Sequence, residues 1–263
     1  MTSIPAATVI LLRDSPDGPE ILMIKRGDNL AFAGGALVFP GGRVDPADLT
    51  TARDPDLASG FEGLDDTDAA ARIACCREAL EETGVLLTSG DAADPVQLAA
   101  ARAELAGGPD SAEACTFAAI LAGLKHQVAA ERFIPFARWE PPAAAAIKRR
   151  FDTHFYLADA GNTAGADISP DGGEAVAILW TTAALVLASE ARGEAALVFP
   201  TKCNLQRLGQ YDSVAAIMAA AGARTPPFVQ PEIIERDGAT WLTIPADCDY
   251  PVTEERLAAV RRE

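Results

Sequence analysis

Histidines and cysteines with catalytic or metal-binding spacing are missing from this sequence. Only two histidines, His126 and His154, occur in 263 residues. No serine or cysteine nucleophile signature lies near either, so we expect both to be structural. The five cysteines are odd in number, and no pair has zinc-ligand spacing, which favours a reduced compartment. These cysteines are Cys75, Cys76, Cys115, Cys203 and Cys248.

Basic residues are also in short supply. Lysine and arginine total 22 against 38 acidic residues, which gives a formal net charge of −16. A surface this acidic repels phosphate backbones, so we expect no standing nucleic-acid partner. A small phosphorylated substrate stays compatible with the charge, because local cations and a metal ion can reverse the potential inside a cleft.

Long hydrophobic segments are absent. The longest mostly apolar stretch, residues 175–188, contains Thr181 and Thr182 and is too short to span a bilayer. The apolar run at residues 9–12 lacks a basic leader and is followed directly by Arg13, which predicts a strand and not a signal peptide. We therefore expect a cytoplasmic protein without membrane association.

Short apolar runs and helical patterns alternate without a regular strand–helix–strand rhythm. This predicts an α/β (α+β) fold with a mixed β-sheet, and not a doubly wound parallel sheet. The turn-rich stretch 45–66 reads as a surface excursion. The expected strands are residues 7–13, 20–25, 36–39, 151–157, 175–180, 232–235 and 240–244. The first expected helix begins within residues 65–68 and ends near residue 83. The other expected helices are residues 96–105, 111–124, 182–191 and 204–221.

The strongest chemical signal is the helical segment from Arg77 to Val85. Glu78, Glu81 and Glu82 are three and four residues apart, so their carboxylates share one helix face. Like charges at this spacing repel unless a cation lies between them, and divalent cations such as Mg²⁺ prefer oxygen ligands. Arg77 is placed to hold Glu81 by a charge-assisted hydrogen bond. The alternative is a solvated acidic face on a surface helix.

Arg-Glu-x-x-Glu-Glu-x-Gly, beginning at Arg77, resembles the second half of the Nudix box. Residues 39–45, Phe-Pro-Gly-Gly-Arg-Val-Asp, resemble the loop that opens the box. The acidic box position then falls on Asp48, which is not a glutamate and lies 29 positions before Arg77. This is many more than in a standard box, so we interpret residues 49–68 as an insertion that forms a surface loop. Reading the box from Gly63 restores the spacing but puts Ala69 at the acidic position.

The resemblance implies a single Nudix hydrolase domain over residues 1–263, with a mixed sheet sandwiched between helices, extra helices and a C-terminal extension at 226–263. It also implies a hydrolase that cleaves the diphosphate linkage of a nucleoside diphosphate derivative with Mg²⁺ or Mn²⁺. The implied metal ligands are Glu78, Glu81, Glu82 and a backbone carbonyl of Gly41 or Gly42. Arg77 would position a glutamate, and the general base would be Glu78 or the distant Glu174.

Resemblance to coenzyme A diphosphatases suggests a substrate. Residues 25–42 partly match the motif that precedes the box in those enzymes, although Ala31 and Ala33 replace its Arg and His. The inserted box and residues 150–156 and 199–201 look closer to a peroxisomal Nudix branch associated with coenzyme A derivatives. Arg26, Arg43 and Arg150 are the predicted substrate-binding residues.

Several alternatives stay open. The substrate could be NADH or ADP-ribose, and the protein could be a Nudix-fold module that senses a nucleotide without cutting it. A homodimer is compatible with the sequence. An isomerase of isoprenyl diphosphates is disfavoured because no added Cys and Glu pair is placed for it. We expect Glu81 and Glu82 to be exposed, so that a glutamine at either position removes hydrolysis with little effect on the fold.

Overall fold

A computed structural model of the chain describes residues 3–27, 34–89, 93–105, 116–143, 145, 149–161, 168 and 175–257. Its centre is an eight-stranded mixed sheet with the order β10-β7-β8-β1-β2-β3, in which β4 also pairs with β1 and β9 with β2. The strands are β1 (Ile4–Ser15), β2 (Gly18–Arg26), β3 (Leu37–Val38), β4 (Gly41–Arg43), β7 (Ile134–Trp139), β8 (Phe151–Asp159), β9 (Ala175–Thr182) and β10 (Phe228–Val229). The expected mixed sheet is confirmed.

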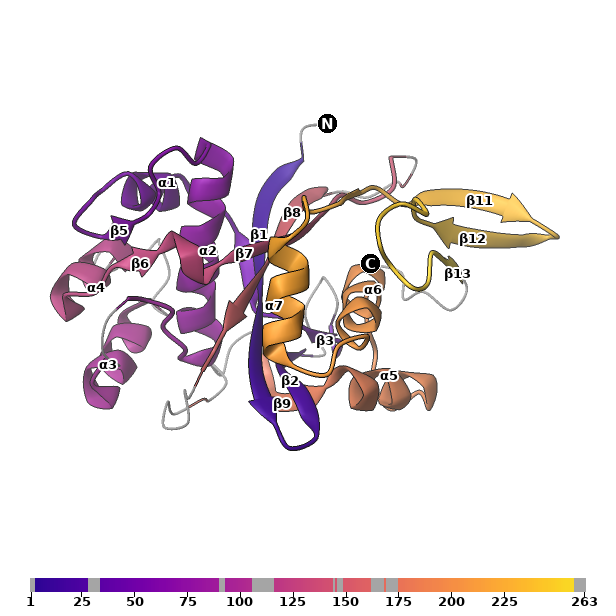
Figure 1. The fold of residues 1–263 in the computed structure, drawn as a ribbon, viewed down its shortest axis with the longest axis horizontal. Coiled ribbons are helices and arrows are strands. Elements are labelled where there is room, and N and C mark those ends of the chain that lie inside the picture. Colours follow the sequence, from indigo (N-terminus) through magenta and orange to yellow (C-terminus); the bar gives the residue numbers. More distant parts are fainter. Residues whose placement is uncertain are drawn as a thin grey trace.

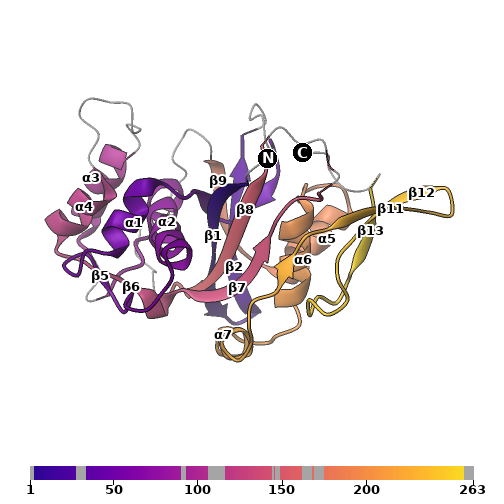
Figure 2. The ribbon, with the colours of Figure 1, turned by 90° about the horizontal axis from the view of Figure 1, so that it is seen from above.

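Helices cover both faces of this sheet (Figures 1 and 2). On one face lie α1 (Pro46–Ala52), α2 (Asp66–Thr83), α3 (Pro95–Leu105) and α4 (Phe117–Leu124). On the other face lie α5 (Ala183–Ala191), α6 (Phe199–Leu208) and α7 (Val214–Gly222). Each layer has its own buried apolar cluster against the sheet. The chain therefore has the expected helix–sheet–helix sandwich.

Strand β1 organises the sheet and the candidate site. Alternate residues face opposite layers, so Val9 and Leu11 pack towards α2 while Ile10 and Leu12 pack towards the other helices. The first part of β1 pairs with β4 and its last part pairs with β2 on the same side, while β8 runs parallel to it on the other side. Because β2 diverges from β1 between these pairings, the short strands β3 and β4 fit into the opening and bring residues 41–43 close to α2.

Helix α2 is the longest helix among the described residues, and most of it is buried. Asp65 caps its N-terminus by accepting a hydrogen bond from the Asp68 N–H at 2.9 Å. Gly84 ends it with φ at 77°, a left-handed conformation that favours glycine. Ile73 and Leu80 are fully buried, and they anchor the part of the helix that carries Glu78 and leads into Glu81 and Glu82.

The predicted surface loop at 49–68 is wrong. The segment contains most of α1, the strand β5 (Ala58–Ser59) and the start of α2, and β5 pairs with β6 (Val128–Ala129) in a separate two-stranded sheet. Leu57 and Phe61 are buried in the cluster around α2. The turn-forming residues therefore separate short elements that pack into the core, instead of forming an irregular excursion. The boundaries of the insertion, the C-terminal extension and the single domain stay predictions.

Two other expectations need correction or restriction. Residues 204–221 form parts of two helices, α6 and α7, with a break at residues 209–213. The predicted helix 111–124 begins at Phe117 within the described part of the chain, and residues 111–115 lie outside it. A short 3₁₀ helix also occurs at Ala130–Arg132.

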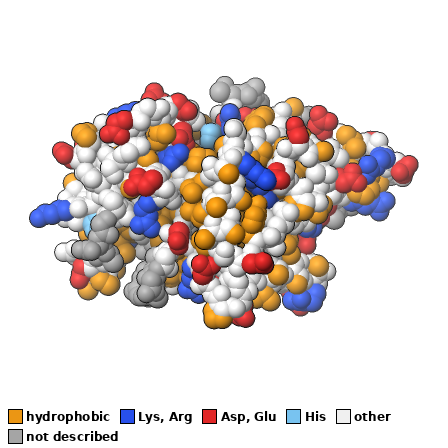
Figure 3. Space-filling model, viewed as in Figure 1, with side chains coloured by type: hydrophobic (Ala, Val, Ile, Leu, Met, Phe, Trp, Pro, Cys, Tyr) orange, Lys and Arg blue, Asp and Glu red, His pale blue; other side chains and the backbone are white. Residues whose placement is uncertain are grey.

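The C-terminal part forms the three-stranded sheet β11 (Glu232–Arg236), β12 (Ala239–Thr243) and β13 (Glu254–Arg256), which extends away from the sandwich (Figure 1). On the face drawn in Figure 3, basic side chains of the described residues are scattered among acidic ones. Within the described ranges, no helix has the length and apolar character needed to cross a membrane.

Candidate active site

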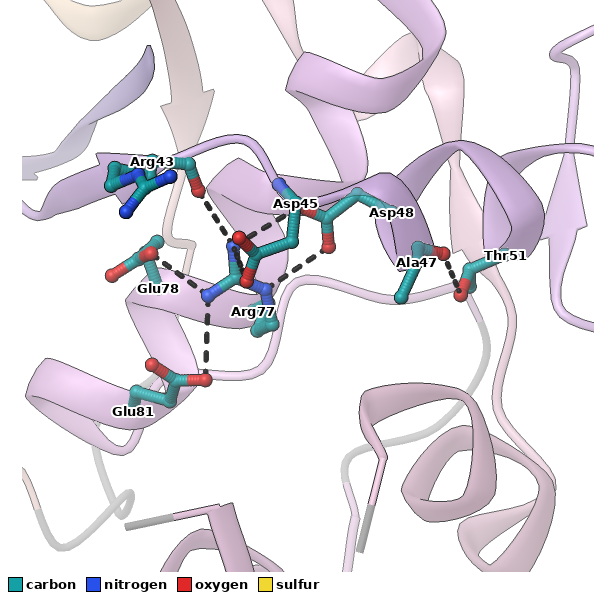
Figure 4. A network of polar contacts seen from close by, with 8 residues as sticks. All are labelled: Arg43, Asp45, Ala47, Asp48, Thr51, Arg77, Glu78 and Glu81. Carbon is teal, nitrogen blue, oxygen red and sulfur yellow. Dashed lines mark hydrogen bonds and ion pairs between the residues drawn. The ribbon is translucent and has the colours of Figure 1, made fainter. Parts of the chain in front are cut away.

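Arg77 lies at the centre of a polar network between α2, β4 and α1 (Figure 4). Its Nε and Nη2 donate to Oδ1 and Oδ2 of Asp48, both at 3.0 Å. Its Nη1 donates to Oε1 of Glu78 at 2.8 Å and to Oε1 of Glu81 at 3.4 Å, and Nη2 also donates to the Arg43 carbonyl at 2.9 Å. Burial alone would lower the pKa of Arg77, but the bonds to Asp48 and the charges of the glutamates raise it, so the guanidinium stays charged.

Asp48 joins the two halves of the interrupted motif. It is 2% exposed and lies in the first turn of α1, where its Oδ2 also accepts the Asp45 N–H at 2.8 Å. The ion pair with Arg77 therefore spans 29 residues of sequence across α1 and β5. This is the position at which reading the motif from Gly42 places an acidic residue.

The two glycines of β4 allow the backbone to approach α2 and β1. A Cβ atom on Gly42 would lie within 2.7 Å of Oε1, Cδ and Oε2 of Glu78. A Cβ atom on Gly41 would lie 2.5 Å from the Ala7 carbonyl oxygen. Side chains at these positions would displace the Glu78 carboxylate in one case and strand β1 in the other.

The expected exposure of Glu81 and Glu82 is wrong for Glu82. Glu82 is 7% exposed, and its Oε2 accepts the Gly41 N–H at 2.9 Å. This contact with β4 could not be read from the periodicity of an isolated helix. The Glu81 side chain is 30% exposed and that of Glu78 is 13% exposed, so the three carboxylates form a partly buried cluster and not a solvated face.

Burial makes the carboxylates of Glu78 and Glu81 costly to ionise. It raises the pKa of Glu78 to about 7, with Arg77 opposing the shift and Glu81 and Asp48 adding to it. Burial also raises the pKa of Glu81, again with Arg77 opposing. One guanidinium thus only partly offsets the three glutamates and Asp48, and further positive charge would stabilise the cluster.

No group of three or more His, Cys, Asp or Glu side chains is arranged to hold a metal ion within the described ranges. The hydrogen bonds of the three glutamates explain why their carboxylates do not converge on one point. Glu78 and Glu81 both turn an oxygen towards Nη1 of Arg77, while Glu82 turns towards Gly41. The cation already present in the chain therefore holds two of the carboxylates, and binding a metal ion would require them to reorient.

The other predicted site residues are only partly brought to this network. Arg43 contributes its main-chain carbonyl. Arg26 ends β2, where its main chain pairs with Gly35 and Ala36. Arg150 donates from Nη1 to the Pro142 carbonyl at 2.8 Å and from Nη2 to the Pro141 carbonyl at 2.7 Å. Glu174 lies outside the described residues. Roles in catalysis or substrate binding at these positions stay predictions.

Sequence reasoning missed Arg102 on α3, which contacts the main chain of the glutamate segment. Its Nε donates to the Glu81 carbonyl at 2.9 Å and its Nη2 to the Glu82 carbonyl at 2.8 Å. The sequence shows only an arginine in an alanine-rich helix, 20 residues after Glu82. No motif or spacing marks it, so only the packing of α3 against the end of α2 could have revealed it.

A mixed sheet between helices, with a glutamate-bearing helix beneath a Gly-Gly strand, defines a Nudix-fold protein. No family model matches the sequence. Among solved structures, the fold is similar to a Nudix hydrolase from Alicyclobacillus acidocaldarius, at 26% identity over 83% of this chain and 96% of that chain, with a TM-score of 0.68. The chain belongs to the Nudix superfamily and is a hydrolase of the Nudix type.

Two other solved structures are less similar to the chain. A MutT Nudix hydrolase from Burkholderia pseudomallei is 18% identical over 70% of this chain and 86% of that chain, with a TM-score of 0.37. The Nudix domain of Shewanella oneidensis NrtR, solved with ADP ribose, is 13% identical over 72% of this chain and 78% of that chain, with a TM-score of 0.39.

Proposed function

We propose that the protein hydrolyses the diphosphate linkage of a nucleoside diphosphate derivative, and that coenzyme A or an acyl-coenzyme A is the substrate class. The observation that carries the proposal is the gathering of Glu78, Glu81 and Glu82 around Arg77 and beneath Gly41 and Gly42. A purely structural acidic helix would gain nothing from burying carboxylates at this cost.

The donor set fits Mg²⁺ or Mn²⁺. Carboxylates and a main-chain carbonyl offer hard oxygen ligands, and burial of Glu78 and Glu81 makes their negative charge unfavourable without a cation. The residues that would hold the ion are Glu78, Glu81, Glu82 and a carbonyl of Gly41 or Gly42. A bound divalent cation would supply positive charge against the diphosphate and favour the ionisation of water.

The chain's own residues have separate tasks in this proposal. Asp48 fixes the guanidinium of Arg77, and Arg77 in turn orients Glu78 and Glu81. Water oxygen bonds to one phosphorus and loses a proton, the bond from that phosphorus to the bridging oxygen breaks, and the bridging oxygen leaves with the second phosphate, which gives two phosphate monoesters. The proton passes to a general base, for which Glu78 and Glu174 are the candidates.

The resemblance to coenzyme A diphosphatases supports the substrate class. Two of the segments that carry it, residues 39–42 and 199–201, are adjacent in the fold. The Leu37 N–H donates to the Ala196 carbonyl at 2.9 Å, and Phe39 and Phe199 share one buried cluster. NADH and ADP-ribose are the second substrate class. Retention of all three helix glutamates favours catalysis over a sensing module.

Product analysis tests the proposal. The purified protein is incubated with Mg²⁺ and coenzyme A, acyl-coenzyme A, NADH or ADP-ribose, and the products are separated by chromatography. We expect 3′,5′-ADP and phosphopantetheine from coenzyme A. Glu78→Gln should remove this activity, and Glu62→Gln, at an exposed position outside the network, should retain it. Turnover of none of these compounds by a folded, metal-binding protein would contradict the proposal.

A further inference from the structure

Helix α3 touches the candidate site through one side chain. Arg102 places two N–H groups of a single guanidinium on successive carbonyls, those of Glu81 and Glu82, at 2.9 and 2.8 Å. The helix otherwise has few buried residues: Ala101 is buried, while Leu98 and Leu105 are partly buried against the core. The Arg102 contact is therefore a principal polar link between α3 and the end of α2.

These carbonyls lie where α2 runs out of its own hydrogen-bond donors. The last described bond of the helical ladder joins the Gly84 N–H to the Leu80 carbonyl at 2.9 Å. Carbonyls in the last turn of a helix lack intrahelical partners, and a positive charge there also complements the helix dipole. Arg102 supplies both donors and charge at this end, which would otherwise be free to fray.

Glu81 and Glu82 carry the carboxylates proposed to bind the metal ion. Their side chains are held by other elements, since Glu82 accepts the Gly41 N–H and Glu81 accepts from Arg77, and these side chains would turn to bind the ion while Arg102 keeps the main chain in place. The main chain and the side chain of each residue are thus held by different elements. Small displacements matter here, because Mg²⁺ demands near-ideal octahedral geometry.

We propose that Arg102 is a positioning residue for metal binding, which acts through the main chain of Glu81 and Glu82 and touches neither metal nor substrate. The inference rests on the proposed function, because it assumes that these glutamates bind the ion. Outer-shell partners of metal ligands typically change metal affinity by about 10- to 100-fold. Loss of the Arg102 contacts should therefore weaken metal binding with little effect on the rest of the fold.

Arg132 provides a matched control. Its Nη1 donates to the Thr88 carbonyl at 2.8 Å and its Nη2 to the Asp159 carbonyl at 3.2 Å. It is thus also an arginine that links two main-chain carbonyls, but these lie outside the glutamate segment. Arg132→Ala reports the effect of losing such a link on stability alone.

The experiment measures Mn²⁺ binding by the full chain, from the electron paramagnetic resonance signal of free Mn²⁺, and thermal unfolding of the same samples. We expect the dissociation constant to rise about tenfold or more in Arg102→Ala and to stay within about twofold of wild type in Arg132→Ala. Arg102→Lys, which keeps the charge but not the planar pair of donors, should give an intermediate value. Amide hydrogen exchange over residues 81–85 should accelerate in Arg102→Ala.

The outcomes separate this inference from the proposed function. A wild-type protein that binds no Mn²⁺ would overturn the proposed function and the role of Arg102 with it. Tight binding by wild type and an unchanged dissociation constant in folded Arg102→Ala would overturn only the positioning role. Equal weakening in the Arg102 and Arg132 variants would also overturn it, by pointing to general destabilisation. If Arg102→Ala fails to fold, unchanged affinity in folded Arg102→Gln refutes the role.

Discussion

Replacing Asp48 by asparagine should strongly lower the free energy of unfolding, because the Asp48–Arg77 ion pair is buried. Asp48 is 2% exposed and bonds both Nε and Nη2 of Arg77. Removing one partner of a buried ion pair costs about 3–5 kcal/mol, because the other charge stays buried. Asparagine keeps the shape and one acceptor, and Arg77 keeps Glu78 and Glu81 as partners. We therefore expect a loss of about 3 kcal/mol, a large part of the ~5–15 kcal/mol that stabilises a typical domain.

Urea unfolding followed by circular dichroism measures this loss, with Asp66→Asn as the control. Asp66 pairs with Arg53 at 2.7 Å, a shorter distance than in the buried pair, but its side chain is 73% exposed. Exposed pairs contribute about 1 kcal/mol or less, so the control should change stability little. Equal losses in the two variants would refute the reasoning that burial, and not proximity, decides the strength of the Asp48 pair.

Three further predictions concern the glycines and glutamates of the site. Gly42→Ala should displace the Glu78 carboxylate and weaken Mn²⁺ binding in a folded protein. Gly41→Ala should instead lower the melting temperature, because its Cβ would press against strand β1. The opposite pattern would contradict the close approach of Gly42 to Glu78 and of Gly41 to Ala7. Glu82→Gln should abolish hydrolysis yet stay folded, because the amide oxygen can still accept the Gly41 N–H, and near-normal activity would argue against a ligand role. The pKa of Glu78 is raised to about 7 from 4.5, so the folded metal-free state holds this proton more tightly than the unfolded state. The free energy of unfolding of the metal-free protein should fall by up to about 3 kcal/mol as pH rises from 4.5 to 7 and then level off. Glu78→Gln should remove this pH dependence from melting curves.

Local signals in the sequence are sufficient to predict the elements whose ends are fixed by a capping residue or a turn glycine. Helix α2 begins after the capping Asp65 and ends at Gly84, close to the predicted limits. The hairpin β1–β2 turns between the two predicted strands, 7–13 and 20–25, with Gly18 at φ 104°. In both cases the residues that fix the backbone conformation lie within the element or next to it, so a linear pattern contains the information.

The failures come from contacts between distant segments. Strand β7 escapes prediction because Pro135 interrupts its pattern, and the structure accommodates this proline at an irregularity in the pairing with β8. Helix α1 resembles part of a loop in sequence because its apolar residues gain meaning only against α2. Burial of Glu82 depends on strand β4, and the Arg102 contacts depend on how α3 packs. Neither leaves a mark in the local sequence.

The parallel pairing of β1 with β8 cannot form until most of the chain between them has been synthesised. Thr8 pairs with Phe155, so the two strands meet across more than half the chain. At a synthesis rate of about 5–20 residues per second, β8 follows β1 out of the ribosome after roughly 7–30 s. Hairpin formation with β2 takes only about 1–10 μs, so residues 12–15 of β1 can pair almost at once, while the edge that pairs with β8 stays unpaired. During that interval the unpaired N–H and C=O groups on this edge of β1 can bond to other strands, so the central pairing of the sheet is the one most exposed to error during synthesis.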